Sequence, residues 1–248
     1  MTNKVALITG SSRGIGAKTA LLFAQRGYAI VLNYRSSYVD AENLQREIIS
    51  LGVECIAVQA DVSKQEDVER LFKEADKLGQ LAVLVNNAGI LDKQSRLEQI
   101  SPERFLRVLE VNVLSCFLCT KEAIKRMSTK YGGTGGAIVN VSSAASKTGS
   151  PNEYVDYAAS KGAMDTLTRG AAIELADEGI RVNGVRPALI YTDMHSLGGQ
   201  ADRVDRLKGN LPLKRGGTPE EVAEAIIWLA TEKSSFVTGS FIDTTGGL

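Results

Sequence analysis

The chain has 248 residues, of which 44% are hydrophobic and 23% are charged, which suits a packed globular protein. Its 29 basic and 29 acidic side chains cancel at pH 7, so charge gives no reason to expect nucleic acid or an anionic membrane as a partner. No apolar run approaches the roughly 20 residues of a membrane helix, and no signal-peptide core precedes the first glycines. Three cysteines cannot all pair within one chain, so we expect a reducing, cytoplasmic compartment.

Short apolar runs alternate with longer amphipathic runs along the chain. We predict strands over residues 5–9, 29–34, 55–61, 81–89, 137–143, 180–187 and 235–243. We predict helices over residues 14–27, 40–51, 63–78, 101–130, 155–177 and 218–231. Ser63 and Thr218 each open a capping-box pattern, and Ser101 precedes a proline at the first helical position.

Uniformly apolar strands separated by helices are typical of a parallel sheet covered on both faces. Right-handed crossovers then predict an α/β fold, a single-domain doubly wound parallel sheet of the Rossmann type with helices on both faces. No linker or repeat divides residues 1–248. We expect a cofactor half over about 1–135 and a catalytic and substrate half over about 136–248, with a mobile lid over about 192–216.

A glycine-rich turn follows the first predicted strand and leads directly into a helix. It has the sequence TGSSRGIG, residues 9–16. The glycines let the backbone bend tightly and approach a ligand, and the amides at a helix N-terminus suit a pyrophosphate. A plain tight turn is the alternative, but the strand–turn–helix context favours a dinucleotide site.

The end of the second strand indicates which dinucleotide binds. Asn33, Tyr34 and Arg35 stand there, without the acid that accepts hydrogen bonds from the ribose in NAD sites. Arg13 and Arg35 suit a 2′-phosphate, which favours NADP(H) and leaves NAD(H) possible. The alternative is that Arg35 is a solvated surface residue. Asp61 follows the third strand, where it either accepts a hydrogen bond from the adenine amino group or acts as a cap.

Cys116 and Cys119 form a C-x-x-C pattern, which a redox pair or half of a metal site would also show. The chain has one histidine and no second Cys/His pair to complete a zinc site. We therefore predict no metal, and two small buried residues one helical turn apart.

The sequence YAASK places Tyr157 and Lys161 four residues apart, on one face of a helix. Hydride transfer between a nicotinamide and a carbonyl requires a proton to be delivered to, or taken from, the carbonyl oxygen. A phenol has a pKa of about 10 and is a poor base at neutral pH, whereas a nearby ammonium favours the phenolate and lowers this pKa. Without further motifs, a tyrosine and a lysine at this spacing do not indicate a catalytic site, because many helices carry such residues on a solvated face.

Five motifs in order resemble the short-chain dehydrogenase/reductase family over essentially the whole chain. They are TGSSRGIG, NNAG at residues 86–89, VNV at 111–113, VSS at 141–143 and YAASK at 157–161. The later segments RVNGVRPALIYT and VTGSFIDTTGG also resemble members of the family.

The resemblance implies roles for four catalytic residues. Tyr157 is the acid/base, and Lys161 lowers its pKa and holds the nicotinamide ribose. Ser143 donates a hydrogen bond to the substrate oxygen, with Ser142 as the adjacent alternative. Asn112 holds a water molecule that leads protons to the lysine.

The resemblance also implies the cofactor contacts. The expected cofactor-binding residues are Gly10, Ser12, Arg13, Gly14, Ile15, Gly16, Asn33, Tyr34, Arg35, Asp61, Val62, Asn87, Ala88, Gly89, Tyr157, Lys161, Pro187, Ile190 and Thr192. The family usually has Pro-Gly after the sixth strand, whereas this chain has Pro187 and Ala188. Alanine does not easily adopt a positive φ, so we expect a local difference in the backbone.

The substrate region resembles that of carrier-protein-linked ketoacyl reductases and glucose dehydrogenases, which implies a small carbonyl or alcohol substrate. We expect a pocket with no pair of basic residues aimed at a carboxylate, lined by Ala145, Asn152, Tyr154, Leu189 and Tyr191. We interpret His195 as a surface or lid residue. The family further implies a homotetramer. The alternative function is a non-catalytic NADP(H)-binding regulatory or assembly protein, against which the complete Asn-Ser-Tyr-Lys set argues.

Overall fold

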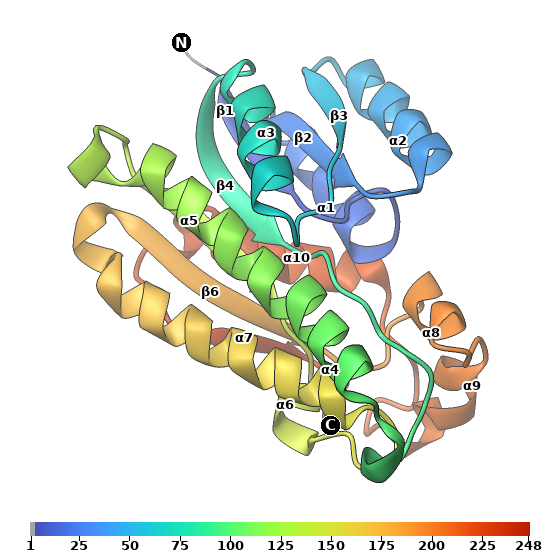
Figure 1. Cartoon of the computed structure of the whole chain (residues 1–248). Coiled ribbons are helices and arrows are strands. Elements are labelled where there is room, and N and C mark those ends of the chain that lie inside the picture. Colours follow the sequence, from blue (N-terminus) through green and yellow to red (C-terminus); the bar gives the residue numbers. More distant parts are fainter. Residues whose placement is uncertain (1–2) are drawn as a thin grey trace.

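Seven short strands pair in parallel into one sheet in the computed structural model, which describes residues 3–248 (Figure 1). The strands are β1 (Lys4–Ile8), β2 (Ala29–Tyr34), β3 (Cys55–Gln59), β4 (Gln80–Asn86), β5 (Gly136–Val141), β6 (Ile180–Pro187) and β7 (Phe241–Thr244). Their order is β3-β2-β1-β4-β5-β6-β7. The order reverses between β1 and β4, and in such sheets a crevice for ligands forms at the carboxyl ends of the strands at this point.

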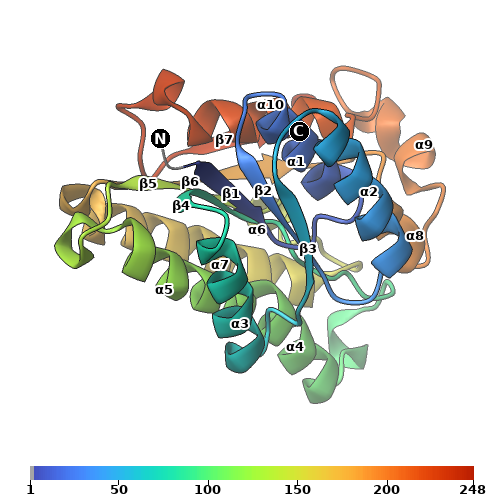
Figure 2. The same ribbon diagram turned by 90° about the horizontal axis from the view of Figure 1, so that it is seen from above.

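Helices cover both faces of the sheet (Figures 1 and 2). One face carries α3 (Gln65–Asp76), α4 (Pro102–Leu109), α5 (Ser115–Met127) and α7 (Val155–Glu174). The other face carries α1 (Gly14–Ala24), α2 (Tyr38–Ser50) and α10 (Pro219–Ala230). The predicted α/β fold is confirmed.

The sheet is apolar on both faces because both faces are buried. In β1, Val5 and Leu7 pack in the core on the side of α3, α5 and α7, whereas Ala6 and Ile8 pack in the core on the side of α1, α2 and α10. Side chains alternate between faces along a strand, so every position of such a strand favours an apolar residue.

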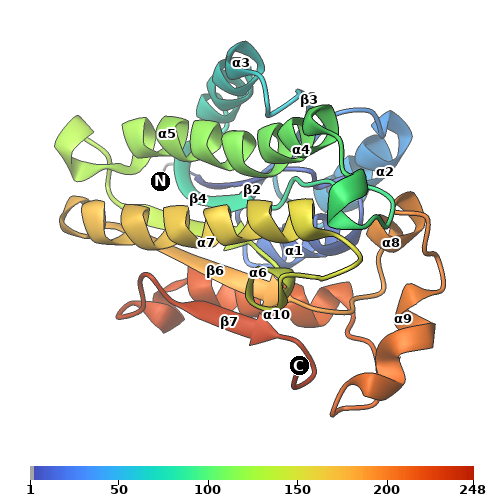
Figure 3. The same ribbon diagram turned by 60° about the horizontal axis from the view of Figure 1, so that its bottom comes forward.

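The helix predicted over residues 101–130 is interrupted. It consists of α4, a π-helical turn over Glu110–Leu114, and α5, which run end to end beside α7 (Figure 3). Sequence periodicity did not indicate this interruption, because a π turn adds a single residue to an otherwise continuous helix. The turn contains Asn112, which is fully buried.

Of the three predicted capping residues, two are confirmed and one is wrong. The Ser101 hydroxyl accepts from the amide of Arg104, and Thr218 forms a complete capping box with Glu221. By contrast, α3 begins at Gln65 and Ser63 does not cap it. The reason is that the Ser63 hydroxyl donates to a carboxylate oxygen of Asp61 at 2.7 Å.

Three short helices in the C-terminal half were not predicted. They are α6 (Ala145–Thr148), α8 (Asp193–Leu197) and α9 (Arg203–Leu207). Figure 3 shows α8 and α9 at the end of the molecule where α7 begins. Helices α8 and α9 lie within residues 192–216, the segment that was expected to form a mobile lid. The last strand also begins later than predicted, at Phe241, because the chain turns before it: the Val237 amide donates to the Ser234 carbonyl at 2.9 Å, and Gly239 has a φ of 71°.

The start of α7 is fixed by an ion pair with α4. The Arg104 guanidinium contacts the Asp156 carboxylate at 2.7 Å, and the Asp156 side chain is only 1% exposed. Breaking such a pair would leave an uncompensated buried charge, which is strongly unfavourable. Tyr157 follows Asp156 directly and is therefore held at this end of the helix.

The three cysteines are buried free thiols, as predicted for Cys116 and Cys119. Both residues lie on α5, and burial raises the pKa of Cys116 to about 12, so its thiol is unreactive. Between residues 3 and 248 no helix combines the length and apolarity needed to span a membrane.

Candidate active site

The glycine turn between β1 and α1 brings the backbone close to the start of the loop after β4. Gly10 and Gly14 both have φ near +60°. A Cβ atom on Gly10 would lie 2.9 Å from the Cα of Ala88, so only glycine fits there. Arg13, the N-cap of α1, makes no side-chain cap. The first amides of α1 therefore remain available, as a pyrophosphate would require.

Two asparagines hold the turn in place. Asn33 accepts from the amide of Gly10 at 3.1 Å and donates to the carbonyl of Ala60 at 3.0 Å. Asn87 donates to the carbonyls of Thr9 and Gly10 at 2.9 Å. The Asn33 side chain is buried and used by the backbone, so it supports the turn from inside, in contrast to the direct cofactor contact expected for it.

The other residues expected at the adenosine end lie around the turn. Arg35 follows β2 and is exposed, and Arg13 is exposed with its Nε 3.8 Å from a carboxylate oxygen of Asp193. Tyr34 is buried. Asp61 accepts hydrogen bonds from the amide and hydroxyl of Ser63 in the loop before α3, and it does not cap that helix, whose N-cap is Lys64. Further expected cofactor residues near the turn are the half-buried Ser12 and Gly89 and the buried Val62.

Tyr157 and Lys161 lie on α7, both buried. The Lys161 ammonium donates to the carbonyl of Val141, the last residue of β5, at 2.7 Å. It lies 5.6 Å from the centroid of the Tyr157 ring. The sequence spacing of four residues thus places the two groups next to each other at the carboxyl end of the central strands.

The two serines after β5 have different surroundings. The Ser142 hydroxyl is buried and donates to Asp165 at 2.6 Å, which leaves it engaged inside the protein. Ser143 is half-buried; its hydroxyl accepts from the amide of Ala145 at 3.1 Å and lies close enough to Tyr157 to oppose the rise in the pKa of that phenol. This geometry supports Ser143 over Ser142 as the residue that faces a substrate.

Asn112 connects the π turn to the loop after β4 and to α7. Its amide accepts from the nitrogen of Ile90 at 2.7 Å and donates to the Ile90 carbonyl and the Ser160 hydroxyl at 3.1 and 3.0 Å. A Cβ atom on Gly89 would lie 3.3 Å from the Asn112 amide oxygen and 3.6 Å from the Lys161 nitrogen. Asn112 therefore fixes the loop after β4 beside the lysine.

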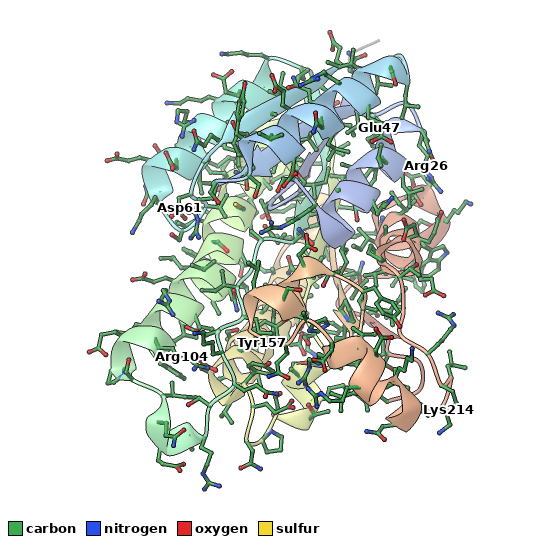
Figure 4. The ribbon with its side chains drawn as sticks, turned by 90° about the vertical axis from the view of Figure 1, so that its right-hand side faces the viewer. Arg26, Glu47, Asp61, Arg104, Tyr157 and Lys214 are labelled. Atoms are coloured by element: carbon green, nitrogen blue, oxygen red, sulfur yellow. The ribbon has the colours of Figure 1, made fainter. Side chains whose placement is uncertain are left out.

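A cavity of about 340 Å³ extends from Ile15 of the glycine turn to the residues expected to be catalytic. Residues expected at the cofactor that line it are Ile15, Asn87, Pro187, Ile190 and Thr192. Ser143, Tyr157 and Lys161 line the same cavity. In Figure 4, Tyr157 lies between the body of the protein and the helices of the predicted lid. One chamber therefore contains both groups of residues.

The substrate side of this cavity was predicted in part. Ala145, Tyr154 and Leu189 line it, whereas Asn152 and Tyr191 do not. Tyr191 instead donates its hydroxyl to Asp205 at 2.9 Å.

Sequence reasoning missed several wall residues, because no motif marks them and the lid helices α8 and α9, which carry three of them, were not foreseen. These are Glu153, Met194, Arg203, Leu207, Asn210, Leu211 and Leu248. His195, interpreted as a lid or surface residue, lies on α8 and lines the cavity.

The pKa of Tyr157 differs from the expectation that Lys161 lowers it. Burial raises the pKa of Tyr157 to about 12, and only Ser143 opposes this effect. Burial lowers the pKa of Lys161 to about 8, although Cys116 and Asp165 act in the opposite direction. The ammonium is directed at the Val141 carbonyl, so in the protein alone it does not produce the expected low pKa of Tyr157.

The backbone accommodates Ala188 in place of the usual glycine. Among the described residues other than glycine, positive φ angles occur at Ser150, Asn152 and Lys214, and Ala188 is not one of them. Its amide donates to the carbonyl of Thr244 at 3.3 Å, which ties the end of β6 to β7.

Known proteins resemble this chain over nearly its whole length. The family model described as Enoyl-(Acyl carrier protein) reductase matches residues 10–248. The chain is 55% identical to Uncharacterized oxidoreductase YgfF of Escherichia coli (strain K12), over 98% of this chain and 99% of that protein. It is 37% identical to the 3-oxoacyl-(acyl-carrier-protein) reductase FabG of Staphylococcus epidermidis, over 99% of each. The crystal structure of 3-ketoacyl-(acyl-carrier-protein) reductase from Brucella melitensis complexed with NADH is 34% identical, with a TM-score of 0.90, over 99% of this chain and 98% of that chain.

The low pKa of Lys161 predicts a stability effect with a defined pH window. Below pH 8 the folded protein holds a buried charge that costs about 3 kcal/mol relative to the unfolded chain. Between pH 8 and 10.5 the unfolded chain binds more protons than the folded one, so wild-type stability rises with pH. We expect Lys161→Met to be more stable than the wild type at pH 7, with the difference disappearing by pH 10.5.

Urea unfolding of both proteins at pH 7, 9 and 10.5 measures this difference. The exposed Lys73 on α3 provides the control, and Lys73→Met should show no such trend. A stability difference for Lys161→Met that stays constant with pH would contradict the burial argument.

Proposed function

Because the chain belongs to the short-chain dehydrogenase/reductase family, we propose that it is an NADP(H)-dependent enzyme that transfers a hydride between nicotinamide and a small carbonyl compound or secondary alcohol. The single observation that carries this proposal is the cavity that Ile15 of the glycine turn lines together with Ser143, Tyr157 and Lys161. The family match establishes an oxidoreductase that acts on carbonyl or alcohol groups. The cofactor preference, the residue roles and the substrate are our proposals.

The nicotinamide supplies or accepts the hydride when it is bound, and the chain supplies the proton and the positioning. Ser143 holds the substrate oxygen and Tyr157 donates a proton to it. Because burial raises the pKa of Tyr157 to about 12, the phenol remains protonated at neutral pH, which favours the direction of carbonyl reduction. Lys161 provides a positive charge beside the phenol, and Asn112 holds the loop next to it.

Arg13 and Arg35 are our reason for favouring NADP(H). Both are exposed beside the glycine turn, and no acidic residue ends β2. Guanidinium groups bind phosphate with paired hydrogen bonds. The related Brucella reductase is described as complexed with NADH, so NAD(H) is the competing cofactor.

A ketoacyl group or a similarly small carbonyl compound is the substrate class that the relatives support, because several are named as 3-oxoacyl-(acyl-carrier-protein) reductases. Residues 1–135 would then mainly hold the cofactor and residues 136–248 the substrate, with α8 and α9 as the lid. The complete Asn112, Ser143, Tyr157 and Lys161 set disfavours a purely regulatory or assembly role.

We also propose a cytoplasmic homotetramer. Free thiols at all three cysteines fit the reducing cytoplasm. Exposed apolar side chains on the outer helices could pack against a partner subunit. Leu106 on α4 is 58% exposed, Phe117 on α5 is 47% exposed and Ile173 on α7 is 82% exposed.

Tyr157→Phe tests the proposed acid directly. The variant removes the proton donor and keeps the ring, so we expect turnover of a carbonyl substrate to fall at least ~100-fold. NADPH binding, measured by fluorescence titration, should remain. The exposed Tyr131 provides a control, since Tyr131→Phe should leave the rate unchanged. If Tyr157→Phe turned over at the wild-type rate, another group would have to deliver the proton.

Arg35→Ala tests the cofactor preference. Loss of this guanidinium should raise the Kd for NADPH at least ~10-fold, because a charge-assisted contact with the 2′-phosphate disappears, and change the Kd for NADH little. Arg46 is also exposed and pairs with Glu42 on α2, so Arg46→Ala should change neither affinity. An equal loss of affinity for both cofactors in Arg35→Ala would refute the 2′-phosphate assignment.

A further inference from the structure

An ion pair lies on the wall of the substrate cavity. The two guanidinium nitrogens of Arg203 donate to the two carboxylate oxygens of Glu153 at 2.9 and 2.5 Å. Both residues line the cavity, with side chains that are 11% and 29% exposed. A paired geometry with two parallel hydrogen bonds is a strong form of this interaction.

The pair joins two parts of the protein. Arg203 is the first residue of α9, and Glu153 lies two residues before α7, the helix that carries Tyr157. Glu153 is held further by the Gln94 amide, which donates to it at 3.0 Å. The Arg203 guanidinium lies 5.1 Å from the centroid of the Tyr154 ring. Both charges therefore have fixed positions, and they neutralise each other at the cavity wall.

Apart from Lys161 at the reaction site, the other polar groups of the wall offer a substrate no cation. The Lys161 ammonium donates a hydrogen bond to the Val141 carbonyl and belongs to the proposed reaction site. The Tyr154 hydroxyl and His195 Nδ1 form no hydrogen bonds with other described groups. Gln94 is near enough to lower the pKa of Tyr154, but its amide donates to Glu153. Burial and Arg203 lower the pKa of His195, so its imidazole is neutral at pH 7.

A substrate carboxylate at this wall would lose its hydration without gaining a partner, which is strongly unfavourable for a buried ion. An uncharged ketone or ester has no such penalty and can pack against apolar wall residues such as Leu91, Leu189 and Met194. Glu153 is the residue that disfavours a substrate carboxylate, because without its charge Arg203 would be an unpaired cation in the cavity.

On the basis of the proposed function, we infer that Glu153 is a specificity-determining residue that masks Arg203 and restricts the enzyme to uncharged carbonyl substrates. The role of Glu153 is electrostatic, so removing its charge while keeping its shape should change the accepted substrate class. The substitution Glu153→Gln does this, and it should convert a pocket for neutral ketones into one that also binds keto acids.

Ligand binding tests this inference without requiring turnover. The probes are 4-oxopentanoate and its ethyl ester, measured by calorimetry against the full-length protein saturated with NADP⁺. We expect the wild type to bind the ester at least ~10-fold more tightly than the acid. In Glu153→Gln we expect this preference to shrink at least ~10-fold, through tighter binding of the acid.

Two further variants separate charge from loosening of the lid. Glu153→Asp keeps the charge and should keep the preference for the ester. The double variant Glu153→Gln with Arg203→Gln breaks the same ion pair without exposing a cation, so it should not gain affinity for the acid.

The inference is overturned if the wild type binds acid and ester equally, if Glu153→Gln gains no affinity for the acid, or if the double variant gains as much. If the binding preferences appear as expected but no carbonyl compound oxidises NADPH, the proposed activity is wrong, whereas the inference that Glu153 masks the charge of Arg203 stands.

Discussion

The candidate active site depends on one lysine ammonium, which donates to a backbone carbonyl inside the protein. The Lys161 nitrogen donates to Val141, the last residue of β5, and this contact fixes the lysine beside the Tyr157 ring. Burial makes the charge expensive, as the lowered pKa of Lys161 shows, and a protein keeps such a charge only where surrounding structure holds it. Buried titratable groups with strongly shifted pKa values are typical of functional sites.

The surrounding structure supplies this support from several sides. Behind the lysine, Asp165 accepts from the Ser142 hydroxyl at 2.6 Å and from the Arg186 guanidinium at 2.9 Å, which ties α7 to the ends of β5 and β6. On the opposite side, the π turn between α4 and α5 directs Asn112 toward the loop after β4 and toward α7. The fold therefore fixes the proposed catalytic side chains through buried polar contacts, whereas the short helices α8 and α9 complete the cavity wall.

The sequence predicted the parts of this arrangement that local patterns control. Apolar runs located the strands because both faces of the sheet are buried, and the i, i+4 spacing placed Tyr157 and Lys161 on one ridge. The role of Asn33 and the interruption of the helix at residues 110–114 were not foreseen, because both depend on contacts between distant segments. For the same reason, the pairing of Glu153 with Arg203, 50 residues apart, has no signature in the sequence. The pKa of Tyr157 was expected to fall, and local spacing gave no measure of the burial that raises it.

The central claim is that a carbonyl carbon receives a hydride in the cavity beside Tyr157. Incubating the protein with NADPH deuterated at both C4 positions of the nicotinamide, together with a panel of aldehydes, ketones and sugars, tests this claim most directly. Mass spectrometry of the products should show an alcohol that carries one deuterium on the former carbonyl carbon. If no member of the panel acquired deuterium while the protein bound the cofactor, the chain would not be the carbonyl reductase described above.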